Sequence, residues 1–397
     1  MSKNKHLTIT GLLLITALIA APAIAEPARF RVATFNTSLS RAPEGKLVED
    51  LATGRDPAAR RTAEILQRIR PDIVLLQEVD HDPAGEAVQL LQDQYLGVSQ
   101  NGRLPIDYPY VYLPAVNTGE LADIDLDGDG AITLPRDAWG FGMFPGHFGF
   151  VVLSRYPLDV VRMRTFQRFL WADMPGGLRP DDPDTAEAGD YYSDNVWSKL
   201  RLSSKNHVDL PVMIDGRTIH LLLSHPTPPV FDGPEDRNGR RNHDEIRLWK
   251  DYLTGGEAAS YIVDDRGGVG GLARGSHFVL LGDMNADPFD GDSTDQAVAQ
   301  ILNHQRVRAE PVPASRGAVV DAEREGGANL THEGPAAQDT ADFGGPGNLR
   351  VDYVLPSKTM RVLRSGVFWP PAGHPLEGLV ETSDHRLVWM DLEVHGY

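Results

Sequence analysis

Residues 277–288 read HFVLLGDMNADP. The run HFVLLG has the unbroken apolar character of a buried strand, and it stops at a turn flanked by Gly and Pro that carries Asp283 and Asn285. Carboxylate and carboxamide groups suit the binding of a metal and its water better than they suit a core. A second polar segment, SDH at residues 383–385, lies just before the apolar run 387–390. Two such polar segments beside predicted strands indicate a hydrolytic site at one edge of a β-sheet.

The rest of the chain alternates between apolar runs typical of strands and amphipathic stretches typical of helices. The predicted strands are 31–36, 73–78, 150–154, 218–223, 277–282, 351–355, 362–368 and 387–394, and the predicted helices are 57–69, 86–96, 244–253 and 295–302. Mixed elements with several consecutive late strands favour an α/β fold, a two-sheet α/β sandwich with helices on the outer faces. No linker divides the chain, so we expect a single domain over residues 26–397, with insertions at about 115–140 and 173–195.

The N-terminus predicts a secretory signal peptide. Lys3 and Lys5 precede an apolar run, and Ala23-Ile24-Ala25 supplies a small-residue cleavage signal before Glu26. The apolar run is too short to span a bilayer. We therefore expect residues 1–25 to be removed and the mature protein to be secreted or periplasmic, without a transmembrane segment.

Composition restricts the chemistry of the mature chain. The sequence has no cysteine, which excludes both a disulfide framework and a thiol nucleophile. Its net charge is −18, and removal of the two lysines of residues 1–25 leaves 36 basic and 56 acidic residues, a net charge of −20. Such a field repels polyanions and favours small phosphate esters over long nucleic acids.

Polar residues that could bind a metal or a phosphate close a series of apolar runs. Taken singly, each is more typical of an ordinary turn. They are Asn36, Glu78, His225, Asp283 with Asn285, Asp352, and Asp384 with His385.

These residues stand in six local sequences that follow one another between residues 33 and 388: ATFN, LLQEV, LLLSHP, LLGDMNADP, RVDYVL and SDHRLV. In this order the chain resembles the endonuclease/exonuclease/phosphatase superfamily, the fold of pancreatic deoxyribonuclease, abasic-site endonucleases, inositol-phosphate phosphatases and bacterial sphingomyelinases. The resemblance implies metal-assisted, in-line attack of water on a phosphate ester without a covalent enzyme intermediate.

The resemblance also implies a metal site. Glu78 corresponds to the principal Mg²⁺ ligand (Mn²⁺ is the alternative ion), since hard divalent cations prefer carboxylate oxygens. Asn36 and Asp384 would complete the metal shell directly or through water.

The same resemblance assigns the catalytic roles. Asp283 would orient or deprotonate the attacking water, and Asn285 would donate to a phosphoryl oxygen. His385 would bind the phosphate or act as acid or base, with Asp352 fixing its tautomer. His225 would contact the phosphoryl group or assist the leaving oxygen.

Three arginines are candidates for substrate binding. Arg155 follows a strand and is either a phosphate-binding residue or a structural residue at a strand-end turn. Arg237 and Arg240 belong to a cluster of arginines that suits a second phosphate or an anionic head group. In the same cluster, Asn242 with Glu245 fits a capping box that opens the next helix.

An acidic insertion resembles an EF-hand loop. Asp125, Asp127 and Asp129 occupy positions one, three and five, and Gly130 occupies position six. Position twelve is Arg136 in place of a bidentate Glu, although an aspartate comes next. The pattern predicts a structural Ca²⁺ loop, with an unliganded acidic turn as the alternative.

The sequence therefore predicts a secreted, monomeric, metal-dependent phosphoesterase that acts on small or lipid-derived esters. An extracellular nuclease and a catalytically inactive, calcium-stabilised binding module are the alternatives.

Overall fold

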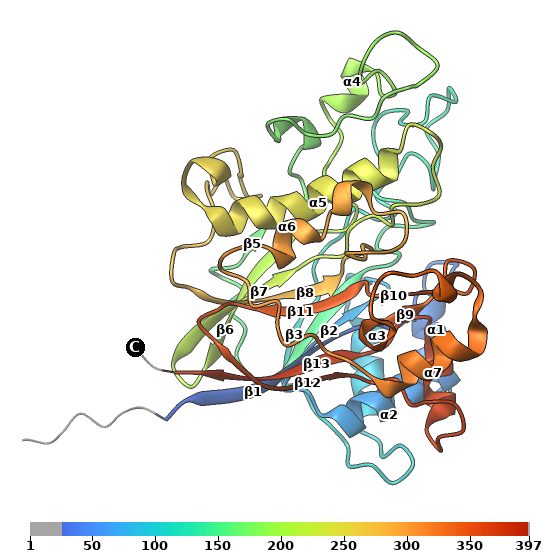
Figure 1. The fold of residues 1–397 in the computed structure, drawn as a ribbon, viewed down its shortest axis with the longest axis vertical. Coiled ribbons are helices and arrows are strands. Elements are labelled where there is room, and N and C mark those ends of the chain that lie inside the picture. The colour runs from blue at the N-terminus through green and yellow to red at the C-terminus, as the bar shows by residue number, and fades with distance from the viewer. Residues whose placement is uncertain (1–25, 396–397) are drawn as a thin grey trace, which may run out of the picture.

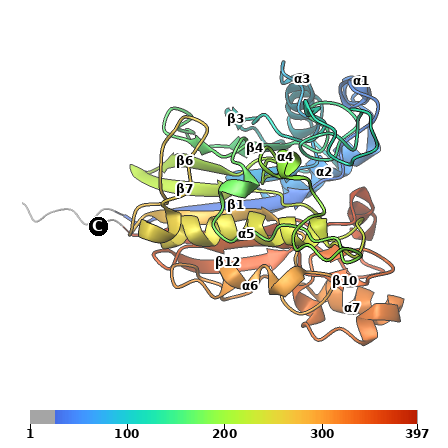
Figure 2. The same cartoon turned by 90° about the horizontal axis from the view of Figure 1, so that it is seen from above.

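The structure is a computed structural model that describes residues 26–395. The predicted signal peptide lies outside the described residues. Two β-sheets pack face to face, and helices cover the outer face of each sheet (Figure 1). In Figure 1, α5 lies above the strands and α2 below them. Seen from above, α5 lies in front of the strands (Figure 2). This arrangement confirms the predicted two-sheet α/β sandwich.

The first sheet has the strand order β12-β13-β1-β2-β4-β3. Its central strands β1 and β2 run parallel, so their carboxyl ends meet at the same edge. Strand β13 runs antiparallel to β1 and therefore begins at that edge. The bounds are β1 Ala28–Asn36, β2 Ile73–Gln77, β3 Tyr110–Tyr112, β4 Phe150–Ser154, β12 Arg361–Val367 and β13 Val388–Val394.

The second sheet has the order β11-β8-β7-β6-β5, in which β7 and β8 are parallel. A separate two-stranded sheet pairs β9 with β10. The sequence did not indicate β6, whose apolar run is interrupted by Pro211. The bounds are β5 Arg164–Thr165, β6 Val208–Ile214, β7 Arg217–Leu223, β8 His277–Asp283, β9 Ala341–Asp342, β10 Asn348–Leu349 and β11 Asp352–Pro356.

The helices agree with the sequence prediction where an amphipathic pattern is strong. Helix α2 has the predicted bounds, because Pro57 opens it and Asp56 Oδ1 caps it by accepting from Ala59 N at 2.7 Å. None of the helices within residues 26–395 is long and apolar enough to span a membrane. The bounds are α1 Lys46–Ala52, α2 Pro57–Ile69, α3 Glu86–Leu90, α4 Asp194–Trp197, α5 Arg237–Thr254, α6 Ala299–Leu302 and α7 Arg316–Glu325.

Helix α5 corrects one prediction. It begins at Arg237, seven residues before the predicted start, so Asn242 and Glu245 lie inside the helix and form no capping box. Asn242 Nδ2 instead donates to the carbonyls of Thr227 and Met284, at 2.8 and 2.9 Å. Because Met284 follows β8, this buried amide fastens the helix to the turn that carries Asp283.

The core consists of three main apolar clusters. One fills the space between the sheets, with Val32, Leu221 and Leu281 among its members. A second packs α5 and α6 against the second sheet, and a third packs α1 to α3 against the first. Because both faces of each central strand are buried, the strands themselves are rigid platforms for the residues at their ends.

Candidate active site

Strand direction brings the predicted site residues to one edge of the sandwich. Asn36 ends β1 and Glu78 follows β2, while His225 and Asp283 lie at the carboxyl ends of the parallel pair β7 and β8. The antiparallel strand β11 begins at the same edge, where Asp352 pairs in register with Asp283.

Gly282 permits the close approach of β7 and β8 at this edge. Its φ is 154°, and a Cβ at this position would lie 2.0 Å from the carbonyl oxygen of Ser224. A side chain here would therefore force the strand ends apart and displace Asp283.

Asp283 is the centre of the cluster and is 1% exposed. Its Oδ2 accepts from Asn36 Nδ2 at 3.1 Å and lies 3.3 Å from His225 Nε2 and 3.6 Å from His385 Nε2. Its Oδ1 accepts from the backbone N–H of Asn285 at 2.9 Å. Burial raises the pKa of Asp283 to about 6, against the opposing charge of His385.

His385 lies between two carboxylates. Its Nδ1 is 2.9 Å from Asp352 Oδ2, which also accepts from Thr340 Oγ1 at 2.9 Å. Burial opposes a charge on the imidazole, but Asp352 and Asp283 outweigh burial and raise the pKa of His385 to about 10. His385 is therefore a cation at neutral pH, and Asp352 fixes its orientation.

His225 has the opposite charge state. Burial lowers its pKa well below the ordinary value, and the charges of Lys205 and His385 act in the same direction. A neutral imidazole that faces the Asp283 carboxylate carries its proton on Nε2. Its buried Nδ1 has no hydrogen-bond partner among the described residues.

Of the three predicted metal ligands, Glu78 and Asn36 are in contact. Asn36 Nδ2 donates to Glu78 Oε1 at 3.0 Å, the one hydrogen bond found for that carboxylate in residues 26–395. Asp384 is exposed and is linked to Asn36 through two serines. Ser38 Oγ donates to Asp384 Oδ1 at 3.3 Å and Ser38 N–H donates to Asn36 Oδ1 at 3.2 Å. Ser383 Oγ lies 3.4 Å from Asp384 Oδ1 and donates to the carbonyl of Asn36 at 2.8 Å. The carboxylate of Glu78 thus keeps most of its acceptor capacity for a ligand, and burial raises its pKa.

Lys205 belongs to the site and was missed by the sequence prediction. It is 6% exposed, and no hydrogen bond or ion pair of its ammonium is found among the described residues. Burial lowers its pKa, against the carboxylates of Glu245, Glu78 and Asp283. The segment SSKNH before β6 closes no apolar run, so the sequence carried no pattern to indicate this lysine.

The structure does not bring Arg155 to this cluster. Its guanidinium lies 3.3 Å from Asp72 Oδ1, beside the start of β2, whereas Glu78 follows the end of that strand. The two ends of the strand are roughly 17 Å apart at the usual rise per residue. The structural alternative is therefore the one that fits Arg155.

Arg237 and Arg240 lie in the first turns of α5 and contact loops. Arg237 pairs with Glu235 and donates to the carbonyl of Phe231 at 3.1 Å. Arg240 donates to the carbonyl of Arg179 at 3.2 Å. Neither shows a contact with the Asp283 cluster, and their role in substrate binding stays a prediction.

The acidic insertion forms a compact loop. Asp125 and Asp127 place carboxylate oxygens within 4.8 Å of those of Asp137, the residue after position twelve. Asp125 accepts from the N–H groups of Gly128 and Gly130 at 2.7 and 2.8 Å. Asp129 is exposed and stands outside this group, so Asp137 replaces it in the set that the structure brings together.

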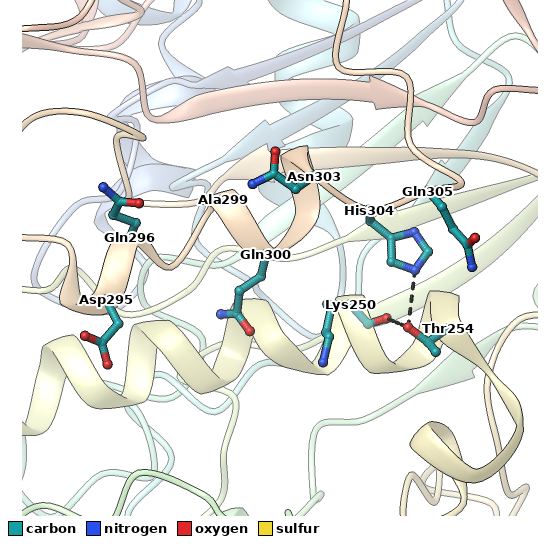
Figure 3. Close-up of a pocket in the computed structure, with 9 residues that line it drawn as sticks. All are labelled: Lys250, Thr254, Asp295, Gln296, Ala299, Gln300, Asn303, His304 and Gln305. Carbon is teal, nitrogen blue, oxygen red and sulfur yellow. Dashed lines mark hydrogen bonds between the residues drawn. The ribbon is translucent and has the colours of Figure 1, made fainter.

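A separate pocket of about 420 Å³ lies between α5 and the segment around α6 (Figure 3). Its lining includes Lys250, Thr254 and His304, and Thr254 Oγ1 lies 3.2 Å from His304 Nε2. The lining residues of α5 come from its last turns, away from Asn242, which contacts the Asp283 turn. None of the predicted site residues lines this pocket.

The sequence matches the model of a known protein family. A family model described as the Endonuclease/Exonuclease/phosphatase family matches residues 33–385, and no curated protein matches the sequence. Among solved structures, the chain is similar to an endonuclease/exonuclease/phosphatase from Beutenbergia cavernae, with 18% identity, a TM-score of 0.48 and coverage of 93% of this chain and 72% of that one. It is also similar to sphingomyelinase C from Streptomyces griseocarneus, with 15% identity, a TM-score of 0.45 and coverage of 91% and 99%.

Proposed function

The chain belongs to the Endonuclease/Exonuclease/phosphatase family, and on that premise we propose that it hydrolyses a phosphate ester with the help of a bound divalent cation. The observation that carries the proposal is the convergence of Asn36, His225 and His385 on Asp283 Oδ2. The pKa of His225 is lowered and that of His385 is raised, and titratable groups whose pKa values are shifted apart are typical of acid–base sites.

Glu78 and Asn36 are the residues proposed to hold the cation, with Asp384 contributing through water. Their donor atoms are hard oxygens, which suit Mg²⁺ or Mn²⁺. When bound, the cation would neutralise charge that develops on the phosphoryl oxygens.

The remaining residues act directly on water and substrate in this proposal. Asp283 orients the attacking water and accepts its proton, which its raised pKa favours. The imidazolium of His385 and the ammonium of Lys205 face the phosphoryl group, and Asn285 contributes its amide N–H groups. His225 assists the leaving oxygen. No step forms a covalent enzyme intermediate.

Charge supports a small or lipid-derived ester over nucleic acid as the substrate. The chain has a net charge of −18, and the arginines proposed for substrate binding are engaged in local contacts. A polyanion would meet this field along its whole length, whereas a small ester meets only the site.

Two further features of the mature protein belong to the same proposal. We expect cleavage after residue 25 and export as a monomer. We also expect the loop around Asp125, Asp127 and Asp137 to bind Ca²⁺ and to stabilise a chain that has no disulfide.

A hydrolysis panel tests the proposed function. Bis(nitrophenyl) phosphate, nitrophenyl phosphate, phytate, sphingomyelin and plasmid DNA are incubated with the protein, with Mg²⁺ or with EDTA, and with the Asp283→Ala variant. We expect turnover of at least one ester that disappears with EDTA and in the variant. Turnover of DNA alone would establish the nuclease alternative, and turnover retained by Asp283→Ala would refute the assigned role.

A further inference from the structure

A second group of acidic residues lies outside the proposed active site. Asp321 and Glu325 are one turn apart on α7, and Asp342 lies in β9. Their carboxylate oxygens lie within 4.8 Å of one another. Asp321 is buried, whereas Glu325 is exposed, so the group opens to solvent on one side.

A buried amide oxygen without a hydrogen-bond donor in residues 26–395 lies beside this group. Asn348 is 1% exposed and pairs with Asp342 across β9 and β10, and its Nδ2 donates to Asp321 Oδ2 at 3.4 Å. Its side chain therefore lies against two of the three carboxylates. Its carbonyl Oδ1 is buried and has no hydrogen-bond partner among the described residues. An unsatisfied buried acceptor is destabilising unless a ligand contacts it.

The nearby cations do not neutralise the group fully. Arg324 pairs with Asp321 and lies 3.9 Å from Glu325, but it also lies 3.5 Å from Glu377, on the exposed side. Arg386 remains 3.8 Å from Asp342. Burial and the neighbouring carboxylates of Asp342 and Asp321 raise the pKa of Glu325.

We propose that Asp321, Glu325, Asp342 and the carbonyl oxygen of Asn348 form a second divalent-cation site, and that it takes Ca²⁺. Ca²⁺ accepts six to eight oxygen ligands in flexible geometry, including amide carbonyls, while Mg²⁺ requires near-ideal octahedral geometry and keeps several waters. Oxygens from a helix and from two short strands suit the larger and more tolerant ion.

The position of the site gives it a consequence for the proposed active site. The N–H of Asp342 donates to the carbonyl of Asp384 at 2.8 Å, and Ala341 bridges to His385. Thr340, one residue earlier, donates to Asp352. A cation that joins α7 to β9 and β10 therefore stabilises the segment against which Asp352, Asp384 and His385 are packed.

Equilibrium dialysis with Ca²⁺ alone tests this proposal through ion stoichiometry. An Asp125→Asn background removes the contribution of the loop around Asp125. In that background we compare Glu325→Gln and Asp342→Asn with the control Glu323→Gln, an exposed residue of the same helix outside the group. We expect each test variant, but not the control, to bind one Ca²⁺ fewer per chain and to lose the rise in Tm that Ca²⁺ produces.

Glu325 is exposed, so Glu325→Gln is expected to fold, and circular dichroism confirms this before dialysis. Equal stoichiometry and an equal Tm rise in Glu325→Gln and Glu323→Gln would overturn the proposal. So would the absence of bound Ca²⁺ from the background protein at millimolar concentration, which would mean that Arg324 and Arg386 suffice for the group.

Discussion

The two ends of the same strands have opposite charge arrangements. Where β2 begins, Asp72 faces Arg155 at 3.3 Å, and where β13 ends, Glu393 faces Arg29 at 2.8 Å. Both of these acids face an arginine. At the other end, the carboxylates of Glu78, Asp283 and Asp352 face one another, two histidines and a buried lysine.

This difference separates stability from function. Partly exposed ion pairs of the first kind contribute about 0–1 kcal/mol each and need no further explanation. Buried carboxylates that face one another reduce stability, because burial and repulsion both disfavour their charged forms. Shifted pKa values of this kind are typical of functional sites, and this supports the proposed catalytic role of the cluster.

The largest expected effect comes from Asp283→Asn, which keeps the shape of the side chain and removes its basicity. The proposed role predicts a loss of kcat on the active ester of roughly 10²- to 10⁴-fold, the usual contribution of a general base. Stopped or continuous nitrophenol release measures it. The matched change at the other end, Asp72→Asn, should leave kcat unchanged, and similar losses in both variants would abolish the contrast between the two ends.

Lys205→Met should lower activity and raise stability together. Without the ammonium we expect roughly 10²-fold lower kcat/KM, since a charge aimed at the phosphoryl group is lost. Because burial lowers the pKa of Lys205 despite the carboxylates nearby, its replacement by an apolar side chain of similar volume should also raise the free energy of unfolding, by about 1 kcal/mol. Urea unfolding measures the change in stability, and steady-state kinetics measure the change in kcat/KM. A variant that is less stable and fully active would show that Lys205 has no role in the site.

The raised pKa of His385 makes the stability of the protein depend on pH. Its folded-state pKa of about 10 lies above the ordinary value of 6.5, so its contribution is complete below pH 6.5 and is lost as the pH rises towards 10. In Asp352→Asn this slope should shrink, because the main charge that raises the pKa is gone. Urea unfolding from pH 6 to pH 10 measures it, with the exposed His374→Gln as control; an unchanged slope in Asp352→Asn would contradict the pairing.

The smallest effect belongs to Arg155→Ala. Its partner Asp72 lies at the end of the strands where acids face arginines, and Arg155 itself is exposed. The free energy of unfolding should therefore fall by no more than about 1 kcal/mol, and kcat and KM should not change. A clear rise in KM would show instead that Arg155 contributes to substrate binding.

Most of the strand-end residues could be predicted from the sequence, because a polar residue that closes an apolar run is a local feature. Arg155 shows the limit of that pattern. It closes β4 as Glu78 closes β2, but the two strands are antiparallel, so their carboxyl ends lie at opposite edges. Local sequence does not contain strand direction.

Other parts of the site depend on contacts between distant segments. Lys205 lies near Asp283 but belongs to a segment without strand or helix periodicity. Asn348 of β10 contacts Asp321 of α7, which is distant in the sequence. The early start of α5 has the same origin, since the polar residues of its first turns contact loops and show no apolar stripe.

A calorimetric Mg²⁺ titration of the unmodified protein and Glu78→Gln tests the central claim most directly, that the unpaired carboxylates at this end bind a catalytic cation. The control is Glu86→Gln, an exposed residue of α3. We predict one Mg²⁺ site in the unmodified protein and in Glu86→Gln, and binding weaker by at least about tenfold, or about 1.4 kcal/mol, in Glu78→Gln. Equal affinity in all three proteins would contradict the claim.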